Sequence, residues 1–397
     1  MFNDRNVIFV LVIIQGLSMS AMEMSGPFWP LHIQALLGPT SQQHLALLAM
    51  AAYAGPMLAA MAFSPIWGWL GTKTGHKAMI VRALVALGIF QAMTVFISDP
   101  VVVVSIRCLQ GGFAGFLAAA QAYSLLCCQG TAKARTLAML QSATAVGTLL
   151  GPVLGGWLLD IYGFKFICGV ASMICFGCAG FCVFLPNSRP RLSVEHKLGS
   201  LKETDRHWLC GLLAMIALLQ IAKIMPQPFY SLYIVEVLNG PGWVIGVSYA
   251  ASAATLALSA PLWGRLFDRQ SVPHILFAIE LVTWASVITM ALAASASGWA
   301  TFIAARLAWG IWQGALLPVA YILITQTTDP TRHGFLLSLG NSAAKGGALL
   351  GVTAGSAALA WVSISHLFWI VVVAYAIAAL AIRLMRKRIR IPVTLVG

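Results

Sequence analysis

Charge is scarce in this chain, and acidic charge is the scarcest. Only 9% of the 397 residues are charged, and 11 Asp and Glu residues stand against 24 Lys and Arg residues. A soluble protein of this length needs far more charge to cover its surface, so the composition excludes a soluble globular domain.

The motifs of enzymes and metal sites are also missing. The chain has no HExxH, no GxSxG, no phosphate-binding loop and no pair of carboxylates inside an apolar run. The eight cysteines lie in or beside apolar runs, where cysteine acts as a small hydrophobic residue. Cys175 and Cys178 form a CxxC, but no second pair completes a metal site. We therefore expect neither enzymatic activity nor a cofactor.

What the sequence does have is long apolar runs. Twelve of them are close to the roughly 20 residues that cross a hydrocarbon core of about 30 Å. Backbone groups in lipid need partners within their own segment, so each run is predicted to be a helix. The runs cover residues 7–26, 43–66, 77–98, 101–126, 137–159, 165–186, 208–232, 243–264, 274–294, 298–324, 335–359 and 365–382.

Positive charge collects in every second gap between the runs. If the N-terminus is cytoplasmic, the cytoplasmic gaps and the tail carry nearly all the lysines and arginines, and the opposite gaps carry Lys165 alone. This distribution predicts a multi-pass protein of a bacterial-type cytoplasmic (inner) membrane with both termini in the cytoplasm. The basic tail is then explained by contact with the lipid bilayer, and nucleic acid is not an expected partner.

The chain repeats itself at intervals of about half its length. GPFWPLHI (26–33) matches QPFYSLYI (227–234), SPIWGWL (64–70) matches APLWGRL (260–266), and VGTLLGPVLG (146–155) matches GGALLGVTAG (346–355). The offsets are 201, 196 and 200 residues, and each match has the same place in a half of six runs. We predict an N-terminal six-helix bundle over 1–186, a cytoplasmic linker over 187–206 and a C-terminal six-helix bundle with a basic tail over 207–397.

Two six-helix repeats with cytoplasmic termini and a charged central loop resemble the major facilitator superfamily over essentially the whole chain. The resemblance implies an all-α membrane protein of 12 transmembrane helices in two pseudo-symmetric bundles, which rock around a central site for a small-molecule substrate. In that family helices one, four, seven and ten line the site. Twelve spans in one chain suffice for transport, so we expect a monomer.

The fifth run carries the most specific motif. Gly147, Gly151, Pro152, Gly155 and Gly156 complete G-x-x-x-G-P-x-x-G-G, which resembles the signature of the drug–proton antiporter (efflux) branch. Small residues at this spacing also allow close helix packing without any antiporter activity, and that reading remains open.

The loop after the second run resembles the family's G-x-L-x-D-R-x-G-R-[RK]. It keeps Gly68, Gly75 and Lys77, has Lys73 for an arginine, and has Thr72 at the acidic position. The resemblance implies that this loop gates the cytoplasmic mouth. In the family the acidic residue of this loop joins an ion pair that closes the cytoplasmic mouth. Because Thr72 replaces that residue in the first half, we expect gating to rely on the second-half copy, which keeps Asp268 and Arg269.

Five ionisable residues lie well inside the runs: Glu23, Arg107, Lys223, Arg306 and Lys345. Charge inside a membrane is costly, so each is a functional candidate. At 1.5 Å per residue, Glu23 lies roughly 24 Å from the cytoplasmic end of its helix and Arg107 roughly 9 Å from the outer end of its own. The two are therefore expected at nearly one height in the bilayer.

Glu23 is interpreted as the proton-coupling group, with Arg107 as its tuning partner. A carboxylate in a partly dry cavity binds its proton more tightly, and a nearby cation weakens that binding. A static ion pair between Glu23 and either Arg107 or Lys223 is the alternative. Glu280, near the cytoplasmic end of the ninth run, is interpreted as a topological charge.

Four interior cations against one interior carboxylate favour an anionic, amphipathic substrate such as a carboxylate siderophore. We therefore predict an exporter driven by protons; a broad multidrug efflux pump and a symporter that imports an organic anion are the alternatives. Beside the four cations, the polar and aromatic residues expected to line the cavity are Gln110, Gln121, Trp309, Trp312, Gln313 and Tyr321.

Overall fold

The apolar runs form helices throughout the described part of the chain. The computed structural model describes residues 4–38, 42–127, 132–186, 203–267, 270–326 and 333–388, and these ranges contain no β-strand. Nine helices among the described residues are long and apolar enough to cross a membrane. One of them, Met139–Val183, has 45 residues and so accommodates two of the predicted runs. The predicted all-α membrane fold is confirmed.

The chain forms two compact units. Unit 1 comprises Met1–Val194 and Gly240–Ala250, and unit 2 comprises Glu195–Asn239 and Ala251–Gly397. Residues 187–202 of the predicted linker lie outside the described residues.

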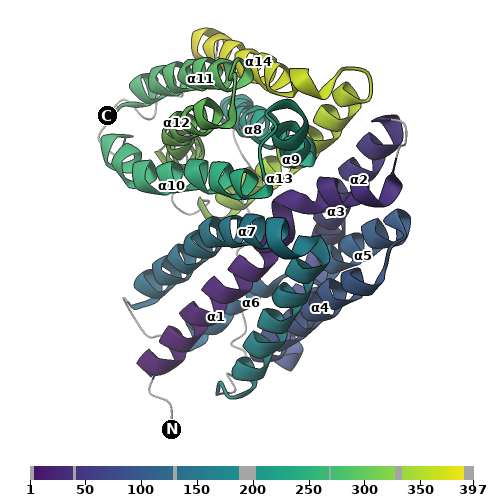
Figure 1. Cartoon of the computed structure of the whole chain (residues 1–397). Coiled ribbons are helices and arrows are strands. Elements are labelled where there is room, and N and C mark those ends of the chain that lie inside the picture. The colour runs from purple at the N-terminus through teal and green to yellow at the C-terminus, as the bar shows by residue number, and fades with distance from the viewer. Residues whose placement is uncertain are drawn as a thin grey trace. The chain divides into compact units, whose positions relative to one another are not determined.

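Unit 1 contains the helices of the first half, which run from purple to teal in Figure 1, and by its residue ranges also the first turns of α10. Within it α1 lies along α7, α4 also packs on α7, and α3 packs on α5. The helices are α1 (Asp4–Ser25), the 3₁₀ turn η1 (Gly26–Phe28), α2 (Trp29–Leu37), α3 (Gln42–Thr74), α4 (His76–Phe96), α5 (Pro100–Phe113), α6 (Phe116–Cys127) and α7 (Ala132–Val183).

Unit 2 repeats this packing scheme with the helices of the second half. The contact of α8 with α13 matches that of α1 with α7, and α11 packs against both α12 and α14. The elements are α8 (Glu203–Ile224), η2 (Gln227–Phe229), α9 (Tyr230–Leu232), the π-helical turn η3 (Tyr233–Val237), α10 (Gly242–Phe267), α11 (Val272–Ala294), α12 (Trp299–Gln326), α13 (His333–Leu359), η5 (Ile364–His366) and α14 (Leu367–Arg388).

Two glycines with positive φ change the course of spans in unit 1. Gly163 (φ 78°, ψ 174°) joins the fifth and sixth spans, so α7 contains both without a loop between them. Gly115 (φ 110°) separates α5 from α6 in the middle of the fourth span. A residue with a Cβ adopts such angles only with strain, which explains glycine at both positions.

Candidate functional site

The first span ends in a break that leaves a carbonyl without its helical partner. α1 stops at Ser25, and Pro30 lacks the N–H that would bond to the Gly26 oxygen four residues earlier. The hydroxyl of Tyr53 on α3 donates to this oxygen at 2.8 Å instead. Glu23 lies one turn before the break, with its carboxylate beside Gly26.

Arg107 on α5 is the cation of this site. It attracts Glu23 electrostatically, without a direct ion pair among the described contacts. Its Nη1 donates to the Gln110 side-chain oxygen, and its guanidinium lies 5.0 Å from the ring centre of Trp29. Among the described residues, Arg107 Nε, Trp29 Nε1 and Gln110 Nε2 are buried donors without an acceptor. A single carboxylate therefore stands among several unused donors.

The glycine stripe of α7 positions the helix that carries Glu23. A Cβ added at Gly151 would lie 2.6 Å from the Ser20 backbone oxygen and 2.9 Å from the Glu23 Cβ. Gly147 and Gly155 leave equally little room against the same face of α1. The motif thus packs helices closely, and the residue seated on its centre is the interior carboxylate.

The remaining motif residues, Pro152 and Gly156, face the first turns of α10 within unit 1. Near them the Asp160 carboxylate accepts hydrogen bonds from the Gly242 N–H at 2.8 Å and the Trp243 N–H at 2.9 Å. A carboxylate at a helix N-terminus satisfies donors that the helix itself leaves open. Asp160 therefore fixes the start of α10 against α7.

Unit 2 holds its own arginine site. Arg306 on α12 is buried, and its Nη2 donates to the Ser252 hydroxyl at 3.0 Å. Its guanidinium lies 4.3 Å from the Trp309 ring centre and 5.1 Å from that of Tyr230. Lys223 on α8 is close enough for electrostatic repulsion from Arg306. Two cations thus share a region in which the described residues provide them with no carboxylate.

The two arginine sites are related by the sequence repeat. Arg107 and Arg306 lie 199 residues apart, and their aromatic neighbours Trp29 and Tyr230 occupy equivalent places in the repeated motif at 26–33 and 227–234. Each half therefore places one arginine against the aromatic residue that follows Pro-Phe. The repeated aromatic position was visible in the sequence as a signal for Trp29 and Tyr230, whereas nothing local to Tyr53 or Ser252 marked them.

The other predicted cavity residues do not form one cluster with the two arginine sites among the described contacts. Gln313 is buried and donates to the Tyr375 hydroxyl at 2.7 Å, next to Trp309. Gln121 is partly buried on α6, and Lys345 on α13 is exposed, with no described contact to Arg306. Tyr321 lies in α12, but its side chain is outside what the structure describes.

The predicted gating loop is a tight turn. Gly75 (φ 91°) stands alone between α3 and α4, and the ammonium group of Lys77 donates to the Val183 and Leu185 carbonyls at the end of α7. Lys77 therefore fastens this turn to the last span of unit 1. Among the other loop residues, Gly68 and Lys73 are exposed, the Thr72 side chain is not described, and Asp268 and Arg269 lie outside the described residues.

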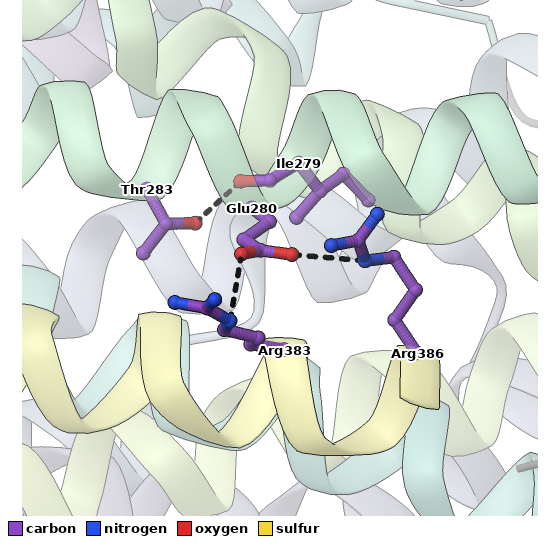
Figure 2. Close-up of polar contacts among 5 residues, drawn as sticks. All are labelled: Ile279, Glu280, Thr283, Arg383 and Arg386. Atoms are coloured by element: carbon purple, nitrogen blue, oxygen red, sulfur yellow. Dashed lines mark hydrogen bonds and ion pairs between the residues drawn. The ribbon is translucent and has the colours of Figure 1, made fainter. Parts of the chain in front are cut away.

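Glu280 has a more specific place than a topological charge. Its buried carboxylate forms ion pairs with Arg386 Nε at 2.9 Å and Arg383 Nε at 3.8 Å, both from α14 (Figure 2). The Arg386 contact lacks the alignment of a hydrogen bond, although the charges are close. The pairing joins α11 to α14 across about a hundred residues of sequence, which explains why a local reading missed it.

Two units with similar helix packing, nine helices among the described residues that are long enough to cross a bilayer, and charged side chains buried between helices are the features of a multi-pass membrane transporter. The chain belongs to the Major Facilitator Superfamily, whose family model matches residues 11–279 and again 212–394.

Individual relatives agree with this assignment. The chain is 26% identical over 388 residues to the "Staphyloferrin B transporter" of Staphylococcus aureus, covering 94% of this chain and 90% of the relative. It is 28% identical over 348 residues to the "Multidrug resistance protein MdtG" of Escherichia fergusonii, covering 85% and 84%. The fold is similar to a bacterial homologue of the human lysosomal transporter Spinster, with a TM-score of 0.77, 13% identity and 97% of each chain covered.

Proposed function

We propose that this protein exports amphipathic organic molecules in exchange for protons, by alternating access and with the proton gradient as its only energy source. The observation that carries the proposal is the position of Glu23. The Cβ of Glu23 packs on Gly151 at the centre of an antiporter-like motif, and the Glu23 carboxylate lies within the electrostatic reach of Arg107. We place the protein in a cytoplasmic membrane, as a monomer with both termini in the cytoplasm.

In this proposal Glu23 takes up a proton when its site is open to the outside and releases it when the site is open to the inside. Access to water and the distance to Arg107 both change the proton affinity of a partly buried carboxylate. The proton and the substrate then act on opposite steps. Substrate drives the outward movement and the proton drives the return, because each binds one conformation better than the other.

We further propose a preference for anionic substrates. Lys223 and Arg306 repel each other in unit 2, and Arg306 Nε is a buried donor without an acceptor among the described residues. A substrate carboxylate would relieve both conditions, since it supplies negative charge and acceptor oxygens. A relative that transports staphyloferrin B supports a substrate of the siderophore class, and a multidrug relative supports a wider range.

The first test uses everted membrane vesicles energised to be acidic inside, with a pH-sensitive dye. We expect a polycarboxylate siderophore to dissipate the gradient in the wild type and to have no effect in Glu23→Gln. Glu236→Gln is the matched control, because that carboxylate is exposed at the end of η3. A siderophore response that persists in Glu23→Gln would overturn the role of Glu23. A response to a lipophilic cation alone would favour the multidrug pump.

A second variant tests the anion preference. Arg306→Gln keeps a hydrogen-bonding side chain but removes the charge, so we expect the concentration of siderophore for half-maximal dye response to rise at least about tenfold. Arg265→Gln, at the exposed end of α10, removes a cation far from this cluster in sequence and should leave the value unchanged. Equal effects of the two substitutions would contradict the assignment.

Symport of an organic anion is the second candidate, and one observation favours it. Protonation of Glu23 removes the negative charge that attracts Arg107, so that Arg107 becomes available to an anion. Proton and anion binding at this one place would then assist each other, which is the thermodynamics of symport. Antiport of an anion requires it to bind elsewhere, as at Arg306. In the vesicle assay a symporter moves protons and substrate across the membrane in the same direction, whereas an antiporter moves them in opposite directions. Measuring both fluxes therefore distinguishes symport from antiport.

A further inference from the structure

A fifth interior cation, beside the four named above, lies next to the break in the fourth span. Arg82 lies on α4, two turns from its start, and its Nη2 donates to the Ala114 carbonyl at 3.2 Å. Ala114 is the residue that follows the last turn of α5. A cation at a helix C-terminus is stabilised by the carbonyl groups that the helix leaves unpaired.

A tryptophan completes this arrangement. The guanidinium of Arg82 lies 3.6 Å above the ring centre of Trp67, and the Trp67 Nε1 donates to the Gly112 carbonyl at 2.7 Å. The end of α5 is therefore held by two side chains, one from α3 and one from α4. Direct stacking on tryptophan also stabilises the charge of Arg82 in this apolar setting.

The chain changes direction immediately after this point. Gly115 has φ 110°, and the nearest atom to a Cβ built there is Arg82 Nη2 at 3.8 Å, so the space around it is open. α6 then begins at Phe116. At the break, the end of α5 is held by side chains, Gly115 allows the change of direction, and α6 begins directly after it.

The second half provides an internal comparison, because it has the same tether without the break. Trp263, the repeat partner of Trp67, donates to the Ile311 carbonyl at 2.9 Å. Ile311 lies on α12, and this helix continues unbroken through Gly314. Gly314 is the repeat partner of Gly115 and is packed against Ser259. The partner of Arg82 is Ala278. The tryptophan tether is common to both halves, whereas the arginine and the break occur together in one.

We propose that Arg82 and Gly115 form a hinge in the fourth span, about which α6 changes direction during transport. Arg82 holds the end of α5 while α6, which carries Gln121, moves. Two further donors of Arg82, Nε and Nη1, are buried without a partner among the described residues. As the break changes geometry, these donors bind other carbonyls of the break, so Arg82 stabilises more than one arrangement. This proposal depends on neither the substrate nor proton coupling.

Hydrogen–deuterium exchange of the full chain in lipid nanodiscs tests the hinge. Arg82→Lys keeps the charge but loses the planar fork, and we expect the amides of residues 114–119 to exchange about tenfold faster. The equivalent amides of residues 313–318 should be unchanged. Trp67→Phe should have the same local effect, and Trp263→Phe, its matched control, should leave residues 313–318 protected because α12 is continuous.

Thermal unfolding separates the hinge from ordinary packing. A hinge residue changes local exchange at the break, whereas a packing residue lowers the melting temperature and raises exchange along α4, α5 and α6 together. The second pattern, or unchanged exchange at 114–119 in both Arg82→Lys and Trp67→Phe, would overturn the proposal.

Discussion

At the residue scale, a missing side chain determines where the interior carboxylate lies. Gly151 has no Cβ, so α1 approaches α7 closely enough for Glu23 to sit directly over the glycine. The sequence predicted this helix pair as either a packing motif or an antiporter signature. The structure makes the two readings compatible, because close packing is what positions Glu23.

We expect Gly151→Ala to destabilise the protein by about 1–3 kcal/mol, since the added methyl overlaps the backbone of α1 at Ser20. Gly177→Ala, on the same helix α7, is the control. Nothing lies within 4 Å of a Cβ at Gly177, so that substitution should stabilise the helix by about 0.5–1 kcal/mol. The melting temperatures of the two variants in detergent should move in opposite directions, and a shared direction would contradict the close approach.

Single residues also show the limits of sequence reading. The prediction that Glu23 and Arg107 lie at nearly one height rests on helix rise alone. Tyr53 could not be predicted, since its partner is a carbonyl freed by a proline on another helix. Arg82 lies two turns from the start of its span and close to Lys77 in sequence, so the sequence alone does not distinguish it from a topological charge.

At the element scale, the last helix of unit 2 is attached by the Glu280 ion pairs. The Arg386 contact is short and the Arg386 side chain is 31% exposed, whereas Arg383 is more distant from Glu280 and is 51% exposed. Arg386 also lies 4.9 Å from the Phe277 ring centre. The two arginines should therefore contribute unequally.

We expect Arg386→Ala to cost about 2 kcal/mol, because it leaves the buried Glu280 carboxylate without its close partner. Arg383→Ala should cost less than about 1 kcal/mol, as for an exposed pair. Denaturation in mixed micelles measures both, and Glu280→Gln in each background closes the double-mutant cycle. Equal losses for the two arginines, or no coupling to Glu280, would disagree with the geometry in Figure 2.

Element positions were more predictable than element interruptions. Hydropathy located the spans because a bilayer imposes a minimum apolar length on each of them. The breaks at Gly115 and Gly163 were not predicted, since a glycine in an apolar run has the same local signature whether it allows close packing or a positive φ. Gly314 and Gly115 are repeat partners, but Gly314 allows close packing whereas Gly115 has a positive φ.

At the scale of the whole molecule, duplication gave two halves with the same helix packing and different chemistry. The pair α1 and α7 carries a carboxylate at its glycine stripe, and in the matching pair α8 and α13 Lys223 lies two residues after Ile221, which meets Gly351 of the second stripe. The prediction of two similar halves rests on repeated motifs that fall at nearly equal offsets. The sequence did not predict which contacts each half makes around its arginine, because those depend on partners from three different helices.

The continuous tenth span and the interrupted fourth span have a mechanical consequence. The two spans respond differently to the same load. An interrupted helix bends at one fixed point, whereas a continuous helix transmits the load along its whole length. The tryptophan tether anchors both spans in the same way, so the break and the arginine beside it, Arg82, make the two spans unequal. A chimera built from two first halves would thus have an interrupted span in each half, and one built from two second halves would have no interrupted span at this position.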